Sequence, residues 1–303
     1  MSLKFFVGVM DRDWYELLRQ MPHLEEVNFW APGGTPFKAL SPGELFLFKL
    51  HAPHHFIVGG GIFTHHTLLP CPLAWEAFGQ ANGAMTLPAM RARIAKYRRV
   101  DPATREDFLI GCRVLTQPFF LEEPDWIPVP ASWAPQIVQG KTYTVDGAEG
   151  AALWDAAAIR LPSQTAVADA ERFGRPVLVQ PRLGQGAFRL LVTDTYHRRC
   201  AVTEERTLPA LDAAHVRPYA DGGVHDIRNG LLLRRDIHSL FDRGYVTVTP
   251  AMRFGVSGRI RQEFENGRHY YALHGGRGHV PDDFARRPDP QALTWHNENR
   301  YLG

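Results

Sequence analysis

The sequence predicts an α+β protein with two domains, and three observations support this class. The chain has 303 residues, 45% of them hydrophobic, so it can bury at least one full core, and its length favours two domains. Apolar runs typical of strands alternate with helical patterns. From about 140 to 170 the pattern becomes Ala-rich and interrupted, as in a connector with a helix. We therefore expect a first domain over 1–145, a linker with a helix over 146–170 and a second domain over 171–303.

The first domain begins with a strand and a helix. Residues 4–10 form a continuous apolar run, which predicts a buried strand. Residues 11–21 show helical spacing, and Asp11 or Asp13 is expected to cap that helix through its side chain.

The rest of the first domain is expected to form a small mixed β-barrel with inserted helices. Two strands are predicted over 44–50 and 55–64, and the second contains three glycines at 59–61. These glycines predict a bulge or a tight barrel corner where another backbone or a ligand comes close. Helical spacing follows over 73–83 and 87–100, and β-like character returns over 111–121 and 126–130.

In the second domain, residues 211–245 predict a strand, a loop, a second strand and a helix in succession. The segment LDAAHV at 211–216 is strand-like, and the chain breaks at Pro218. GLLL at 230–233 suits a second strand. RRDIHSLFDRG at 234–244 has apolar residues at helical spacing and ends on a glycine.

Polar residues on these elements form a pattern suited to phosphodiester hydrolysis. That reaction needs a base to activate water and a cation to stabilise charge on the phosphate, and a neutral imidazole such as His215 can be the base. His238 and Asp242 stand at i and i+4, so they share a helix face and can hold a divalent cation. The amide of Asn229 can bond the backbone across the loop. A lone histidine is more often structural, but the ordered set is far more specific. Three arginines could meet phosphates beside it: Arg234, Arg235 and Arg243.

The motifs AAHVRP, DIRNGLLL and DIHSLFDRG resemble the HNH endonuclease (ββα-metal) superfamily, in the branch with an AAH start and a HSLFD-like helix. The resemblance covers about residues 180–303, including CAVT before the motif and WHNEN near the end. It implies that His215 is the general base, Asn229 the middle asparagine and His238 a metal ligand. Asp242 matches a second helical ligand of some members, and the implied ion is Mg²⁺ or Mn²⁺.

One position departs from this family pattern. Many members have a further ligand directly before the base, where this chain has Ala214. Asp212 is expected to face the other side of the strand, so water or phosphate oxygens should complete the metal shell. His225, in the loop, is expected to be solvated, with a DNA contact or an extra ligand as the alternative. Arg182 and Arg189 flank a glycine-softened segment that is either a phosphate-contacting loop or an ordinary turn.

The first domain resembles the PUA-like superfamily, with its EVE and ASCH relatives, through EEVNFWAP, SPGELFLFKL and HFIVGGGIF. Relatives that bind modified nucleic acid hold a flipped base between aromatic rings. The resemblance implies Asn28 and Trp30 as pocket residues, with Trp75 and Trp126 as further candidates. Core packing is the alternative for each tryptophan. Lys49 could contact a phosphate or extend along the surface from its strand.

Composition bears on the partners and the cellular compartment expected for the protein. A net charge of +2 does not indicate a nucleic-acid binder, although a local basic face remains compatible with it. The three cysteines are far apart, which disfavours a zinc ribbon or a disulfide framework and favours a reducing cytoplasm. The N-terminal apolar run fits a strand better than a signal peptide, and no segment reaches the length of a membrane span.

The two resemblances together imply a modification-dependent DNA endonuclease. Its partner would be double-stranded DNA carrying a modified base, expected to be a modified cytosine, and a homodimer is one way to cut both strands. One alternative is an HNH nuclease acting as a toxin or repair enzyme, with a first domain that binds protein or RNA. Another is a catalytically inactive DNA-binding module.

Overall fold

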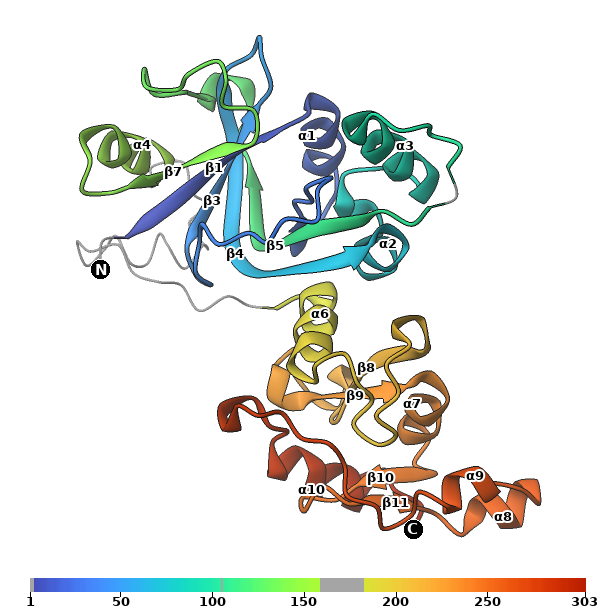
Figure 1. Cartoon of the computed structure of the whole chain (residues 1–303). Helices are drawn as coiled ribbons and strands as arrows, with labels where there is room; N and C mark the ends of the chain where they lie inside the picture. Colours follow the sequence, from blue (N-terminus) through green and yellow to red (C-terminus); the bar gives the residue numbers. More distant parts are fainter. Residues whose placement is uncertain (1–2, 105, 159–182) are drawn as a thin grey trace. The chain divides into compact units, whose positions relative to one another are not determined.

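The computed structural model describes residues 3–104, 106–158 and 183–303 (Figure 1). The chain divides into two compact units, Met1–Ala187 and Phe188–Gly303. Strands and helices occur in both units, which confirms the α+β class. The part of the expected linker from residue 159 onward lies outside the described residues. Among the described residues, no helix combines the length and the apolar character needed to cross a membrane.

The first unit is organised around one curved, mixed sheet, in which β1 and β3 run parallel and the other neighbours antiparallel (Figure 1). Its strands, in spatial order, are β2 (Glu26–Asn28), β5 (Leu109–Phe120), β4 (Phe56–Pro70), β3 (Leu45–Leu50), β1 (Lys4–Met10) and β7 (Gly140–Thr144), with β6 (Ile127–Pro128) beside β4. Its helices are α1 (Arg12–Arg19), α2 (Cys71–Phe78), α3 (Leu87–Arg98) and α4 (Ala148–Ala158).

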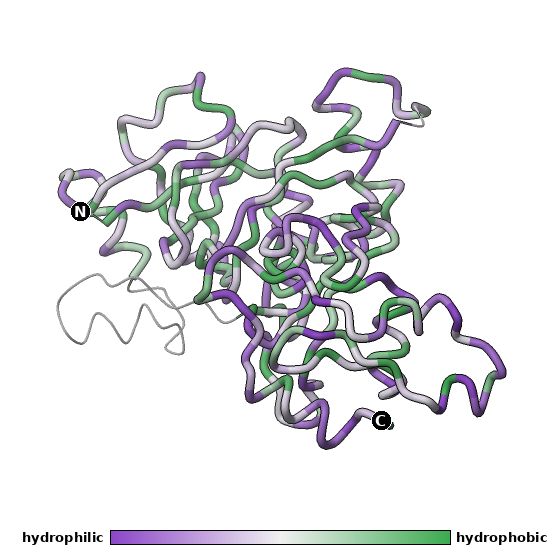
Figure 2. The backbone as a smooth tube through the Cα atoms, turned by 60° about the horizontal axis from the view of Figure 1, so that its bottom comes forward, coloured by the Kyte–Doolittle hydropathy of each residue, from purple (hydrophilic) through white to green (hydrophobic). Residues whose placement is uncertain are grey.

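Both faces of this sheet are buried, and this explains why its central strands are apolar throughout. Phe5 and Val7 of β1 pack into one core with Trp154 of α4. Phe6, the residue between them, packs into a second core with Trp14 of α1. Alternate side chains thus enter different cores, so the strand shows no polar face. In Figure 2, green hydrophobic stretches run through the interior of the tube, and purple hydrophilic stretches are frequent at its outer turns.

The three glycines of β4 allow close backbone approach. The register of β4 shifts against β5 between Gly60 and Ile62, as expected for a bulge. A Cβ added at Gly59 would lie 2.2 Å from the carbonyl oxygen of Phe119, and one at Gly60 would lie 2.7 Å from that of Phe46. The predicted close approach is therefore confirmed, and only glycine fits these positions.

The second unit has the expected strand, loop, strand and helix. β8 (Leu211–His215) pairs antiparallel with β9 (Gly230–Arg234), and α7 (Arg235–Asp242) follows β9 without a break. The remaining elements are α6 (Gln185–Thr195), β10 (Val246–Val248), β11 (Phe254–Val256), α8 (Arg259–Phe264), α9 (Arg268–Tyr271) and α10 (Pro290–Asn299). One core joins these elements, with Phe188 from α6, Ala214 from β8 and Phe241 from α7 among its members.

Candidate functional site

The helix α7 presents His238 between two carboxylates. Its Nδ1 lies 3.2 Å from Oδ2 of Asp212, and its Nε2 lies 3.3 Å from Oδ2 of Asp242. Burial alone would lower the pKa of His238, but the hydrogen bonds and charges of Asp212 and Asp242 outweigh it and raise the pKa to about 9. At neutral pH and without a metal, His238 is therefore an imidazolium held by two acids.

The expectation that Asp212 faces away from the site was wrong. As predicted, Asp212 and His215 point to opposite faces of β8. The face of Asp212 is also that of Ala214, which is buried in the same core as Ile237 and Phe241 of α7. Asp212 therefore reaches α7, where it contacts His238. Its other oxygen lies 3.5 Å from Nε of Arg189. Burial raises the pKa of Asp212, but His238 and Arg189 lower it more.

His215 is held on the opposite side by α6 and by the loop. Its ring stacks on Phe188 with the ring centroids 4.0 Å apart and the planes at 11°. Its Nε2 lies 2.9 Å from Nδ1 of His225, which stacks in turn on Tyr219. Burial, followed by the charges of His225 and His238, lowers the pKa of His215 to about 4. His215 is therefore neutral at physiological pH and able to accept a proton.

His225 is thus not the solvated loop histidine that we expected, because it contacts His215 directly. The sequence offered one signal for this role, its place in the loop that ends at Asn229. Sequence spacing could not show that the loop folds back onto His215.

Asn229 fixes the loop between β8 and β9. Its Oδ1 accepts a hydrogen bond from the backbone N–H of Arg217 at 2.9 Å. Its Nδ2 donates to the carbonyl oxygens of Arg217 and Val224, at 2.9 and 3.0 Å. The side chain is buried, so each of these bonds replaces one that water would otherwise make. Arg217 is two residues beyond His215, so the amide anchors the end of the strand that carries His215.

The donor atoms around His238 fit a divalent cation in type. Carboxylate oxygens are ligands that Mg²⁺ or Mn²⁺ prefers, whereas an imidazole nitrogen is preferred by later transition metals such as Zn²⁺ or Ni²⁺. Among the described residues, however, no group of three or more His, Cys, Asp or Glu side chains is arranged to hold a metal. Both ring nitrogens of His238 are engaged by acids, so an ion could bind this residue only after the imidazolium loses a proton.

The proposed phosphate contacts lie in different environments. Arg189 lies beside Asp212, and Arg235 is exposed at the start of α7. Arg234 forms two hydrogen bonds of 2.7 Å with Asp236. Arg243 is exposed and donates to the carbonyl oxygen of Ser239 at 2.8 Å, and Arg182 lies outside the described residues.

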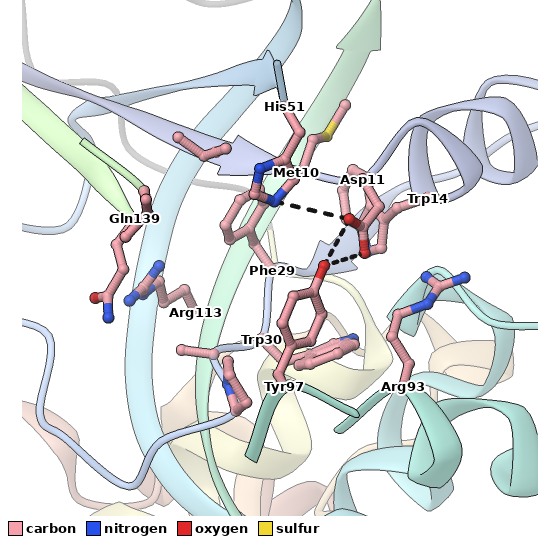
Figure 3. Close-up of a pocket in the computed structure, with 14 residues that line it drawn as sticks. Met10, Asp11, Trp14, Phe29, Trp30, His51, Arg93, Tyr97, Arg113 and Gln139 are labelled. Carbon is pink, nitrogen blue, oxygen red and sulfur yellow. Dashed lines mark hydrogen bonds and ion pairs between the residues drawn. The ribbon is translucent and has the colours of Figure 1, made fainter. Parts of the chain in front are cut away.

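The first unit contains a separate cavity of about 340 Å³, near the lower end of ordinary ligand pockets (Figure 3). Four aromatic side chains line it: Trp14, Phe29, Trp30 and Tyr97. Polar side chains complete the lining: Asp11, His51, Arg93, Arg113 and Gln139. The cavity therefore combines flat apolar walls with a few charged groups. Of the four predicted pocket residues, Trp30 is the one that lines it.

Asn28 does not line this cavity but is linked through Asn82 to Trp30, which does. It is fully buried and donates to Oδ1 of Asn82 at 2.8 Å, while the backbone oxygen of Asn82 accepts from Nε1 of Trp30 at 2.8 Å. Trp75 lies on α2, and Trp126 donates to the carbonyl oxygen of Leu121 at 3.0 Å; neither lines the cavity.

Lys49 is a core residue. It is 2% exposed, and its ammonium donates to the carbonyl oxygen of Leu50 at 2.7 Å and lies over the ring of Trp133. Burial lowers its pKa. Both expectations for Lys49, a phosphate contact or a surface-extended chain, are corrected by this burial, because β3 lies inside the sheet.

Sequence spacing did not identify Asp11, Tyr97 and Arg113 as cavity residues. Asp11 directly follows β1, Tyr97 lies on α3 and Arg113 lies on β5. Asp11 does occupy the N-cap position of α1, but its side chain makes no capping hydrogen bond. It turns instead to Tyr97, whose hydroxyl donates to both carboxylate oxygens at 2.5 Å.

Comparisons with known proteins place the second unit. Residues 200–249 match the family model of the HNH endonuclease, and no curated protein matches the chain. Among solved structures, the chain is similar to a point mutant of the ZmASCH protein from Zymomonas mobilis, with a TM-score of 0.32 and 7% identity, over 50% of this chain and 96% of that one. It is also similar to the modification-dependent TagI restriction endonuclease, with a TM-score of 0.31 and 12% identity, over 98% and 82%. The family match spans β8, β9 and α7, so this chain carries an HNH endonuclease domain and is a nuclease.

Proposed function

We propose that this protein is a modification-dependent DNA endonuclease. The second unit would hydrolyse double-stranded DNA, and the first, as a PUA-like domain, would admit a flipped modified base, a modified cytosine, to its aromatic cavity. The observation that carries the proposal is the pairing of two sites in one chain: His215, held against Phe188 and His225 on an HNH domain, and a cavity lined by Trp30 and three other aromatic rings. Stacking on such walls can offset the few kcal/mol that base flipping costs.

In this mechanism His215 removes a proton from the attacking water. Its lowered pKa keeps the ring unprotonated, and the stack on Phe188 and the bond to His225 hold its orientation. Water attacks the phosphorus, and the 3′ oxygen departs. Asn229 keeps the loop and the end of β8 in place.

His238 and Asp242 are the proposed ligands of a divalent cation, with Asp212 beside them. When bound, Mg²⁺ or Mn²⁺ supplies positive charge to the phosphate and to the leaving oxygen. Arg189, which lies beside Asp212, is a proposed phosphate contact. One such site cuts one strand, so a double-strand break requires two protomers or two successive nicks.

The test is cleavage of three duplexes of one sequence, with cytosine, 5-methylcytosine or 5-hydroxymethylcytosine at one position, in Mg²⁺ or Mn²⁺. We expect at least one modified duplex to be cut faster than the unmodified one. His215→Ala should reduce the rate by roughly 10²–10⁴-fold, the usual contribution of a general base. The control is His269→Ala, which removes an exposed histidine of α9 and should leave the rate unchanged.

Two outcomes would contradict separate parts of the proposal. Equal cutting of all three duplexes would remove the reader function of the first unit while leaving a nuclease. Full activity of His215→Ala would remove its role as base.

A further inference from the structure

The aromatic cavity holds an acid that is free to accept hydrogen bonds. Asp11 makes no capping bond to α1; it accepts from the Tyr97 hydroxyl, and Nε2 of His51 lies 3.7 Å from its Oδ1 (Figure 3). Burial and the bond to Asp11 both raise the pKa of Tyr97, so the phenol stays protonated and remains the donor. An ionised carboxylate has about four lone-pair sites, so Asp11 can accept a further N–H from a ligand.

The same cavity holds a buried cation with an unused donor. Arg113 of β5 is 8% exposed, and its Nε makes no hydrogen bond with the described residues. Its guanidinium lies over the rings of Phe37 and Phe29, 4.6 and 5.9 Å from their centroids. Burial lowers the pKa of Arg113 to about 10, so it remains charged at neutral pH. A buried donor without a partner is unfavourable, and an acceptor on a ligand would satisfy it.

We infer that Asp11 and Arg113 select a base that carries both an amino group and a carbonyl oxygen, as a cytosine does. Figure 3 shows the two side chains at opposite sides of the cavity, with Phe29 drawn between them. A flat ring stacked there would present its amino N–H to Asp11 and its carbonyl oxygen to Arg113. This inference rests on the proposed function and specifies how its reader pocket distinguishes bases.

The chemistry of the other bases supports this choice. Thymine and uracil have a carbonyl in place of the cytosine amino group, and its lone pairs would meet those of Asp11. Adenine has the amino group but no carbonyl oxygen for Arg113. Guanine has both groups but is a larger, two-ring base, and the proposed modification is on cytosine. Specificity of this kind comes from buried polar groups that the wrong ligand leaves unpaired.

The test measures DNA binding by the full chain carrying His215→Ala, so that no duplex is cut. Two pairs of duplexes are compared by fluorescence anisotropy: 5-methylcytosine against thymine, and 5-hydroxymethylcytosine against 5-hydroxymethyluracil, each opposite its normal partner. An unmodified cytosine duplex is the reference. For the modification that is read, we expect the cytosine form to bind at least about tenfold more tightly, the value of one charge-assisted hydrogen bond. Thymine and 5-hydroxymethyluracil pair with adenine, and such pairs open more easily than those of cytosine. Pair opening alone would therefore favour binding of these two bases and cannot explain a preference for the cytosine form.

Two variants test whether Asp11 and Arg113 cause the preference for the cytosine form. Asp11→Asn offers an amide that can donate as well as accept, so the cytosine preference should fall to about one. The matched control is Asp13→Asn, which removes the same charge from the exposed face of α1 and should keep the preference. Arg113→Met should weaken binding of the cytosine form about tenfold. It should not lower the midpoint of urea unfolding, because the cation–π contacts with Phe37 and Phe29 that it removes are offset by the removal of a buried charge that has no ion-pair partner among the described residues.

Each outcome has a separate meaning. If both bases of a modified pair bind equally and more tightly than unmodified DNA, the reader function stands and selection by Asp11 is overturned. If neither modified cytosine binds more tightly than cytosine, the proposed function fails and the inference fails with it. If Arg113→Met unfolds more easily and binds normally, Arg113 is a structural residue and its role as a reader is overturned.

Discussion

At the scale of single residues, His238 couples the stability of the nuclease unit to pH. Its pKa is about 9 in the folded chain against an ordinary value of 6.5, with its side chain 20% exposed. Because the folded value is the higher one, the stabilisation is complete below pH 6.5 and is lost as pH rises through 9. In metal-free protein, His238→Gln should therefore cost about 3 kcal/mol at most at pH 6, and the difference should shrink from pH 6.5 upward and be largely gone above pH 9.

Urea unfolding in EDTA at pH 6, 8 and 9.5 measures this difference. His269→Gln, at an exposed site, controls for the loss of a histidine as such. A His238→Gln effect of equal size at all three pH values would show that the imidazolium between Asp212 and Asp242 does not form.

Some residues of the candidate site can be recognised from short sequence motifs, and others only from the way distant elements pack together. His215, Asn229 and His238 could be named from sequence because each occupies a defined place in a short strand, loop and helix. Asp212 could not, because its role depends on how α7 packs over β8. Arg113 gave no signal, because its place in the cavity depends on elements far apart in the sequence.

At the scale of elements, α10 holds α7 in place through a buried histidine. His296 stacks on Phe241 with the centroids 3.7 Å apart, and its Nε2 donates to the carbonyl oxygen of Phe241 at 3.1 Å. Its Nδ1 then accepts from the hydroxyl of Thr247 on β10, at 2.9 Å. Burial lowers the pKa of His296 to about 4, so the ring is neutral and keeps this tautomer.

We expect His296→Ala to destabilise the protein by roughly 2–4 kcal/mol, because it leaves a cavity and two unpaired groups. Cleavage should fall as well, since Phe241 precedes Asp242 on α7. Urea unfolding and the cleavage rate at 10 °C measure the two effects, with His269→Ala as the exposed control. Unchanged stability would show that α10 does not hold α7.

The elements themselves were largely predictable. The apolar run of β1 indicated a buried strand, and the structure buries it on both faces. The strand, loop, strand and helix of the second unit follow from hydrophobic spacing and turn residues. The helix expected in the linker exists as α4, but its residues Leu153 and Trp154 pack into the core of the first unit. Its Ala-rich composition showed that it is a helix and could not show which surface covers it.

At the scale of the whole molecule, the second unit has the features of a domain that folds by itself. Its main core draws all its buried members from residues 188–293, and its length falls in the range of single domains, roughly 50–250 residues. A fragment of residues 183–303 should therefore unfold cooperatively. If the first unit selects the modified base, this fragment should also cut modified and unmodified duplexes at equal rates, whereas the full chain should not. Circular dichroism during urea unfolding and the three-duplex cleavage assay measure both properties. A fragment that folds and still prefers modified DNA would move the reader function into the HNH unit.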